Sequence, residues 1–210
     1  EHEPSETESR PPLPDLVLLV GMAEPTPSRI DARTGNLDMK SCAIALSSAL
    51  REPDIHDVVK KLRSMHSLKI LTSECPPQEL LKGYFSVPPG DSIFLCCNNL
   101  HTDKDLKQTL RHELVHAFDH LEMKMDFRDP SQLACSEIRA ASCVDCEKVW
   151  KVFKRHCVRH VALRSTTVNF DDKTATEAVD DQLNYCSLGG GLRGLLEGSW
   201  KRTDQRDMGN

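Results

Sequence analysis

The sequence of 210 residues contains no long hydrophobic run. Its longest candidate, residues 13–20, is interrupted by Pro14 and Asp15, so it falls well short of the roughly 20 apolar residues of a membrane-spanning helix. We therefore expect any attachment to a membrane to be peripheral or through a partner. The first residues are acidic and rich in proline, without the apolar centre of a secretory signal.

An excess of basic charge is also absent. Lys and Arg number 27 against 32 Asp and Glu, which gives a formal net charge of −5. This balance does not favour a general nucleic-acid or anionic-membrane footprint. Hydrophobic residues make up 39% and charged residues 28% of the chain, a composition that suits a globular domain able to enclose an active site.

Cysteine, in contrast, is abundant, with nine residues. Proteins of a reducing cytosol seldom carry so many without a metal or redox use. The odd number leaves at least one thiol unpaired if the others form disulfides. Cys96 and Cys97 are neighbours on an expected strand and point to opposite faces, so they should not pair with each other.

Composition and periodicity divide the chain into three parts. We expect a flexible N-terminal tail at residues 1–38, one folded domain at 39–188 and a flexible C-terminal tail at 189–210. Within the domain, the expected helices cover roughly residues 41–53, 56–65, 102–125, 132–142 and 146–163. Two strands are expected, at about 68–72 and 92–97. The pattern weakens after Phe170. The order of elements predicts an α+β fold of the zincin-like type, with a small sheet packed on the longest helix.

That longest helix carries the motif His-Glu-Leu-Val-His at residues 112–116. At about 100° per residue, His116 lies about 40° from His112, so both imidazoles share one face. The apolar residues of the helix fall between about 120° and 240°, on the opposite face. Two neutral imidazoles one turn apart can share one zinc ion, and Glu113 beside them would act as a base.

Glu137, 21 positions after His116, is expected to be the third ligand. On a helical wheel, the residues within about 60° of it are Leu133, Ala134, Ala140 and Ala141. A carboxylate in an apolar stripe needs a countercharge, because its burial alone costs several kcal/mol or neutralises it. A zinc ion would supply that charge; an ion pair with Arg139 or another basic residue is the alternative.

Two residues nearer the motif compete for the third position. Asp119 lies about 20° from His112 on the wheel, and His120 about 80° from it. Residues 112, 116 and 120 would form a row about 12 Å long, which is too extended for three ligands of one tetrahedral ion. Asp119 is better suited to accept a hydrogen bond that orients a ligand imidazole.

Two histidines and one glutamate leave a fourth position for water, whose pKa would fall toward about 7. Glu113 would accept the proton of that water and deliver it to the leaving amine of a peptide. A further donor should stabilise the oxyanion, and Arg139, His160 and Tyr185 are candidates.

The region around residue 150 allows several interpretations. Cys143, Cys146, His156 and His160 resemble a zinc-finger ligand set, but the gap of nine residues is short, and disulfides or free thiols are the favoured interpretation. The basic residues between positions 148 and 164 indicate a solvated helix face or a contact with an anionic membrane surface. Trp150 and Phe153 are expected in the core.

Two segments resemble a known family. Residues 111–119 (Arg-His-Glu-Leu-Val-His-Ala-Phe-Asp) and 133–141 (Leu-Ala-Cys-Ser-Glu-Ile-Arg-Ala-Ala) are similar to motifs of the mitochondrial inner-membrane metalloproteases that mature an ATP synthase subunit. Cys97-Asn98 and residues 157–162 are similar to further motifs of that family. The likeness extends over roughly residues 40–165.

The resemblance implies a peptidase with one catalytic zinc ion on the intermembrane-space side of the mitochondrial inner membrane. It also implies that the substrate is an ATP synthase membrane-sector subunit, that the protein assists assembly of that sector, and that its cysteines form disulfides. Two alternatives remain open: a non-catalytic, zinc-stabilised assembly factor, and a DNA-associated zincin, which the acidic balance disfavours. No nucleic-acid partner is expected.

Overall fold

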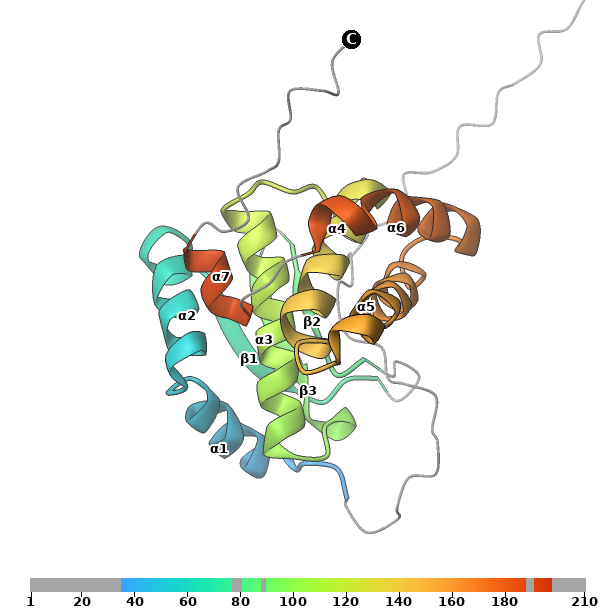
Figure 1. The fold of residues 1–210 in the computed structure, drawn as a ribbon. Coiled ribbons are helices and arrows are strands. Elements are labelled where there is room, and N and C mark those ends of the chain that lie inside the picture. The colour runs from blue at the N-terminus through green and yellow to red at the C-terminus, as the bar shows by residue number, and fades with distance from the viewer. Residues whose placement is uncertain (1–34, 77–80, 88–89, 188–190, 198–210) are drawn as a thin grey trace, which may run out of the picture.

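The computed structural model describes residues 35–76, 81–87, 90–187 and 191–197, and these form one α+β domain (Figure 1). Its helices are α1 (Met39–Ala49), α2 (Pro53–Met65), α3 (Asp103–Leu121), α4 (Pro130–Ala140), α5 (Lys151–Thr166), α6 (Asp172–Cys186) and α7 (Gly191–Leu196). A 3-10 turn, η1 (Cys97–Asn99), precedes α3, and a π-helical turn, η2 (Ala141–Asp145), follows α4. None of the helices in the described ranges is both long and apolar enough to cross a membrane.

A mixed three-stranded sheet lies on one side of α3. Its strands are β1 (Lys69–Ser73), β2 (Gly83–Ser86) and β3 (Ser92–Cys96), in the order β1-β3-β2. β3 pairs in parallel with β1 and antiparallel with β2. β2 approaches α3 so closely that a Cβ on Gly83 would lie 2.7 Å from Thr109 Cγ2, which explains the glycine. β2 was not expected from the sequence.

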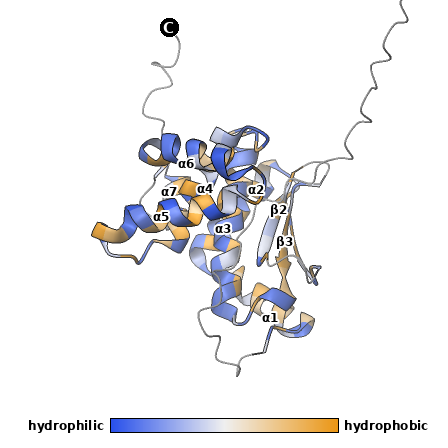
Figure 2. Cartoon of the chain, turned by 90° about the vertical axis from the view of Figure 1, so that its right-hand side faces the viewer, coloured by the Kyte–Doolittle hydropathy of each residue, from blue (hydrophilic) through white to orange (hydrophobic). Residues whose placement is uncertain are grey.

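The long helix α3 is the centre of the domain. It begins in a capping box, in which the Thr102 side chain accepts from the Asp105 backbone N–H and the Asp105 carboxylate accepts from that of Thr102. The sheet covers one side of α3, and α4, α5 and α6 lie on the other (Figure 2). Because α3 is covered on several sides, polar residues in its second half are as deeply buried as its apolar stripe.

Two hydrophobic clusters make up the core. The first joins the sheet to α1, α2 and α3 and contains large side chains such as Leu62, Phe85 and Leu110. The second lies among α4, α5 and α6 and contains small ones such as Ala134 and Ala162. Helix α4 contributes residues to both clusters, so it connects the two parts of the domain.

Eight of the nine cysteines form disulfides, which confirms the expectation of a disulfide-bonded protein. The pairs are Cys42–Cys97, Cys75–Cys96, Cys135–Cys186 and Cys146–Cys157. Cys96 and Cys97 thus have different partners, as their alternation on a strand predicts. Cys143 is free and buried, and burial raises the pKa of its thiol to about 11.

The helix expected from Cys146 to Leu163 begins later than predicted, at Lys151. A continuous helix would hold the Cα atoms of Cys146 and Cys157 about 16 Å apart. They are 6.0 Å apart in the disulfide, so the chain has to turn between them. Trp150 and Phe153, expected in the core, are instead exposed at this turn.

The C-terminal part is more regular than the sequence indicated. The weak pattern after Phe170 is the helix α6. Gly191–Leu196, placed by the sequence in a flexible tail from residue 189, forms α7, and its Leu192 and Leu195 are buried in the first cluster. The rest of that expected tail, at 189–190 and 198–210, lies outside the described residues, as do residues 1–34 of the expected N-terminal tail. Within the latter, the Leu37 N–H donates to the Leu100 carbonyl and Asp38 caps α1.

Candidate metal centre

Helix α3 places two imidazoles side by side. His112 and His116 are one turn apart, and their ring centroids are separated by 4.7 Å. Both side chains are fully buried. Glu113, on the same helix, is also fully buried.

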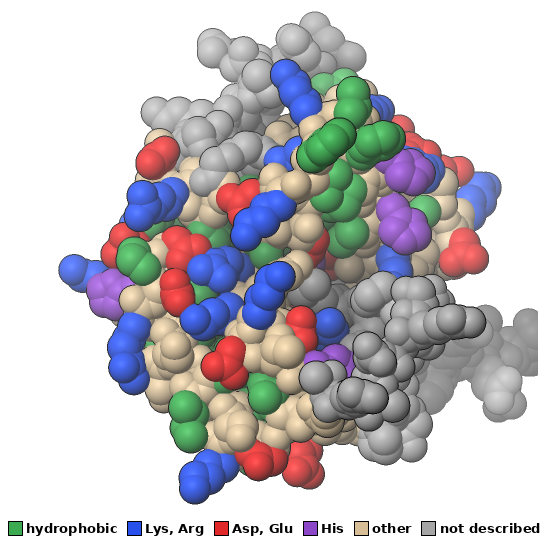
Figure 3. Space-filling view, turned by 60° about the horizontal axis from the view of Figure 1, so that its bottom comes forward, with side chains coloured by type: hydrophobic (Ala, Val, Ile, Leu, Met, Phe, Trp, Pro, Cys, Tyr) green, Lys and Arg blue, Asp and Glu red, His purple; other side chains and the backbone are tan. Residues whose placement is uncertain are grey.

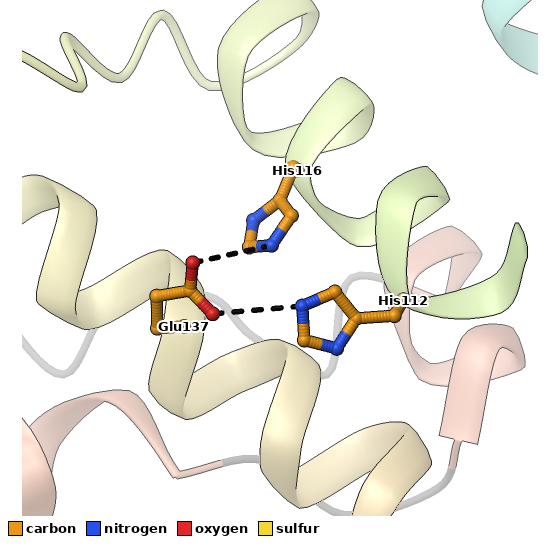
Figure 4. A group of neighbouring side chains, drawn as sticks. All are labelled: His112, His116 and Glu137. Atoms are coloured by element: carbon orange, nitrogen blue, oxygen red, sulfur yellow. Dashed lines mark ion pairs between the residues drawn. The ribbon is translucent and has the colours of Figure 1, made fainter. Parts of the chain in front are cut away.

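Glu137 reaches the same point from α4 (Figure 4). Its Oε2 lies 3.5 Å from His112 Nε2, and its Oε1 lies 3.6 Å from His116 Nε2. The three residues thus present ligand atoms that all lie within 4.8 Å of one another. The structure therefore brings together the two histidines and the distant carboxylate that the sequence selected.

The facing atoms of this cluster fit a bound cation. His112 Nε2, His116 Nε2 and both carboxylate oxygens of Glu137 are buried and have no hydrogen-bond partner among the described residues. Buried polar atoms without a partner are costly and rare in folded proteins. Two ligand atoms about 2.1 Å from one tetrahedral ion lie about 3.4 Å apart, close to the observed separations. A shared ion would bind both nitrogens and the Glu137 carboxylate at once.

The outer nitrogen of each imidazole has its own acceptor. His112 Nδ1 lies 2.9 Å from Asp145 Oδ2, and His116 Nδ1 lies 2.8 Å from Ser136 Oγ. Ser136 donates its one hydroxyl proton to Asp119 Oδ2 at 2.8 Å, so its oxygen can accept from His116. Both rings are then protonated at Nδ1, which leaves the Nε2 lone pairs directed at the cluster.

Asp119 contacts the cluster through Ser136. The sequence suggested that it orients a ligand imidazole, and the structure places Ser136 between it and His116. Its other oxygen, Oδ1, lies 2.8 Å from a guanidinium nitrogen of Arg139 in a buried ion pair. Burial raises the pKa of Asp119 to about 6, against the opposing influence of Arg139, so the carboxylate is ionised at neutral pH.

The electrostatics of the cluster favour positive charge. Burial raises the pKa of Glu137. Burial, together with the charge of His112, holds the pKa of His116 well below its usual value. For His112, burial works against the charged form, but the carboxylates of Asp145 and Glu137 outweigh it and raise the pKa well above normal. A buried site with this balance is stabilised by a cation, either a proton or a metal ion.

Ser136 and Asp145 were not identified from the sequence. Ser136 directly precedes Glu137, and this adjacency was the only signal for it. Asp145 belongs to η2, whose wider turn is shown by the bond from the Cys146 N–H to the Ala141 carbonyl. A regular continuation of α4 would not have revealed it, and π-helical turns are frequent at functional sites.

Several other candidates lie away from the cluster. His120 Nδ1 lies 3.0 Å from the Met125 carbonyl oxygen, and His120 is not part of the cluster. His160 and Tyr185 are exposed on α5 and α6, so they are not placed to stabilise an oxyanion there. The zinc-finger interpretation is wrong, because Cys146 is bonded to Cys157.

An α+β domain with HExxH on its central helix and a glutamate from the next helix defines the zincin-like class of metallopeptidase domain. The chain belongs to the Peptidase M76 family, whose model matches residues 40–188.

Named relatives are similar over part of the chain. A protein of Botryotinia fuckeliana called mitochondrial inner membrane protease atp23 is 38% identical over 112 residues, 47% of this chain and 46% of its own. The human protein called mitochondrial inner membrane protease ATP23 homolog is 37% identical over 107 residues, 45% of this chain and 44% of its own. A Malassezia globosa protein called mitochondrial inner membrane protease ATP23 is 30% identical over 136 residues, 56% of this chain and 55% of its own. The chain spans about half the length of these curated relatives. No solved structure shows significant similarity to it.

Proposed function

We propose that this chain is a zinc-dependent endopeptidase in which His112, His116 and Glu137 bind the metal and Glu113 is the catalytic base. The observation that carries the proposal is the convergence of three buried side chains, each able to offer one ligand atom, at separations that suit one tetrahedral ion and leave its fourth position open. Membership of a peptidase family supports the same reaction. Zinc is the metal proposed, because two imidazoles and one carboxylate with an open position are typical of catalytic zinc.

The residues divide the reaction between them. A zinc ion bound at the cluster supplies Lewis acidity, which polarises a peptide carbonyl and acidifies water. Glu113 accepts the proton of the attacking water on a carboxylate oxygen and passes it to the departing amine nitrogen. Asp145 and Ser136 keep the two imidazoles in the tautomer and orientation that metal binding needs. Because the cluster is fully buried, a peptide has to displace part of the surrounding chain to reach Glu113.

We propose the mitochondrial inner membrane, on its intermembrane-space side, as the location. The relatives are named as proteases of the mitochondrial inner membrane. Four disulfides suit a compartment that permits oxidation. The resemblance in the motifs extends the proposal to a substrate, an ATP synthase membrane-sector subunit, and to assistance in assembling that sector.

The change Glu113→Gln tests the catalytic role. It removes the base but keeps the shape of the side chain, so zinc content should remain at one ion per chain while peptide cleavage falls at least about 100-fold. Metal analysis and cleavage of the subunit precursor are the two measurements. Glu177→Gln, the same change at an exposed position on α6, is the matched control. Undiminished cleavage would remove Glu113 from the mechanism, and loss of zinc would assign it a structural role.

The complete burial of the cluster favours a second candidate, a non-catalytic assembly factor stabilised by its metal. The same variant separates the two functions. In cells that lack the protein, Glu113→Gln should restore ATP synthase assembly if the metal serves only the fold. If proteolysis is required, assembly should remain defective although the variant accumulates normally.

A further inference from the structure

The beginning of α5 exposes large hydrophobic side chains. Trp150, Val152 and Phe153 are exposed by 77%, 81% and 63%. These residues lie within the segment 148–154, here called the α5 tip. In Figure 2 the ribbon at this end of α5 has the hydrophobic colour and lies at the periphery of the molecule. Figure 3 shows a group of hydrophobic side chains together on the surface. Contiguous exposed apolar side chains on a folded domain mark an interaction surface.

The same segment carries positive charge that the domain does not neutralise. Lys148, Lys151 and Lys154 alternate with the apolar residues, and none of them forms an ion pair within the described ranges. From residue 148 to 170 the sequence has no Asp or Glu. Further along α5, by contrast, Arg159 is paired with Asp180 of α6 at 2.6 Å. Among the described residues, the three lysines of the tip thus lack the carboxylate partner that Arg159 has.

This charge is unfavourable for the helix itself. The helix dipole favours acidic residues in a first turn and disfavours cations there. Helices α3 and α6 follow that rule with Asp103 and Asp172, whereas α5 has no acidic residue in its first turn and no side-chain cap. A segment that lowers its own stability and exposes aromatic side chains is better explained by an external partner of opposite charge.

We propose that the α5 tip docks the protein on an anionic lipid bilayer. Trp150 and Phe153 would enter the boundary between headgroups and acyl chains, and the three lysines would contact lipid phosphates. Charge complementarity selects this partner. The protruding aromatic side chains can bury apolar area in the bilayer, and the interleaved lysines are attracted to its anionic headgroups; together these two contributions hold a peripheral protein at a membrane surface. The inference deepens the proposed location at a membrane, since it assigns the surface responsible.

Vesicle binding by the full chain tests the proposal. Vesicles of phosphatidylcholine with about 30% phosphatidylglycerol should bind the protein, and vesicles of phosphatidylcholine alone should bind it much more weakly. Exchange of Lys148, Lys151 and Lys154 for Gln should weaken binding by about fivefold per lysine at low salt. In a Trp200→Phe background, which leaves Trp150 as the one tryptophan, the emission should shift to the blue with anionic vesicles.

Matched controls come from the opposite side of the domain. Ile44→Ser on α1 and Met65→Ser on α2 remove exposed apolar side chains far from α5, as Figures 1 and 2 show for α1, and should leave binding unchanged. Trp150→Ser with Phe153→Ser should weaken binding at least about tenfold. Equal vesicle binding by these tip variants, or Trp150 emission unmoved by vesicles, would overturn the proposal.

Zinc content and cleavage of a soluble peptide separate this inference from the proposed function. Both should be the same in the tip variants and in wild type, because the tip contributes no residue to the metal cluster. If wild type bound vesicles through the tip but cleaved nothing, the peptidase proposal would fail and docking would stand. If it cleaved peptide but the tip variants still bound vesicles normally, docking alone would fail.

Discussion

The two hydrophobic clusters achieve stability in different ways. The first, between the sheet and α1 to α3, buries large side chains such as Leu100 and Phe127. The second, among α4 to α6, is built around small ones such as Ala141 and Ala178. Small residues let helices approach closely but remove less apolar surface from water. The comparison indicates that the second part depends more on covalent links than the first.

The candidate metal cluster of His112, His116 and Glu137 lies where α3 meets α4. Its histidines come from α3, and Glu137 and the acceptors Ser136 and Asp145 come from α4 and η2. Once α4 packs on α3, the three candidate ligands come together, and the acceptors Ser136 and Asp145 lie beside the imidazoles. A metal ion bound there would also join the two parts, since it would bridge ligands of both helices.

The largest expected effect on zinc affinity comes from changing Glu137, the candidate ligand that α4 contributes. Glu137→Gln keeps the volume of the side chain but removes its charge, so metal affinity should fall by more than the roughly 100-fold that loss of an outer partner costs. Titration with zinc, followed by calorimetry, measures the affinity. Addition of zinc should raise the unfolding temperature of wild type and leave that of the variant unmoved. Glu177→Gln again serves as the control. Unaltered zinc affinity would show that Glu137 is not a ligand.

Disulfide removal should distinguish the two parts next. The pairs Cys42–Cys97 and Cys135–Cys186 close loops of similar length, with separations of 55 and 51 residues. Loop-closure entropy therefore assigns each about 4 kcal/mol of the free energy of unfolding. Replacing either pair by serine should cost a similar amount in denaturant unfolding.

The two variants that lack one of these disulfides should lose local stability in different parts of the domain. Without Cys135–Cys186, amide hydrogen exchange should increase mainly in α6, because its alanine-rich contacts hold it weakly. Without Cys42–Cys97, the first cluster retains its large side chains, and exchange should increase throughout the domain only through global unfolding. Identical exchange patterns in the two variants would contradict the difference inferred between the clusters.

The same contrast explains how much could be predicted from the sequence. The helix that carries His112 and His116 has clear apolar periodicity, and its position was predicted from that pattern. Glu137 was found because a carboxylate in an apolar stripe demands a partner. In the second part, α6 presents Ala175, Val179 and Leu183 at helical spacing, but small and acidic residues weakened the pattern.

Other features depend on tertiary contacts that no local pattern contains. The short strand β2 exists because it pairs with β3, and α7 because its leucines reach the first cluster. The turn before α5 is fixed by the Cys146–Cys157 disulfide, whose connectivity the sequence could not supply. Trp150 and Phe153 were expected in the core from residue type alone, but the turn fixed by the disulfide leaves them exposed at the α5 tip.

The smallest expected effects concern the acceptors that hold the imidazoles, Asp145 for His112 and Ser136 for His116. Asp145→Asn replaces a carboxylate by an amide that can still accept a hydrogen bond, whereas Ser136→Ala removes the oxygen that accepts from His116 Nδ1 and breaks its connection to Asp119. Each should weaken zinc binding about 10- to 100-fold without unfolding the domain. Asp181→Asn, an exposed change on α6, is the control for Asp145→Asn.

Because Asp145 lies on η2 and Ser136 on α4, the double variant also tests whether these two acceptors position the two imidazoles independently of each other. Losses that multiply would show that it does, and a double variant no weaker than either single one would show that the two acceptors act as a unit.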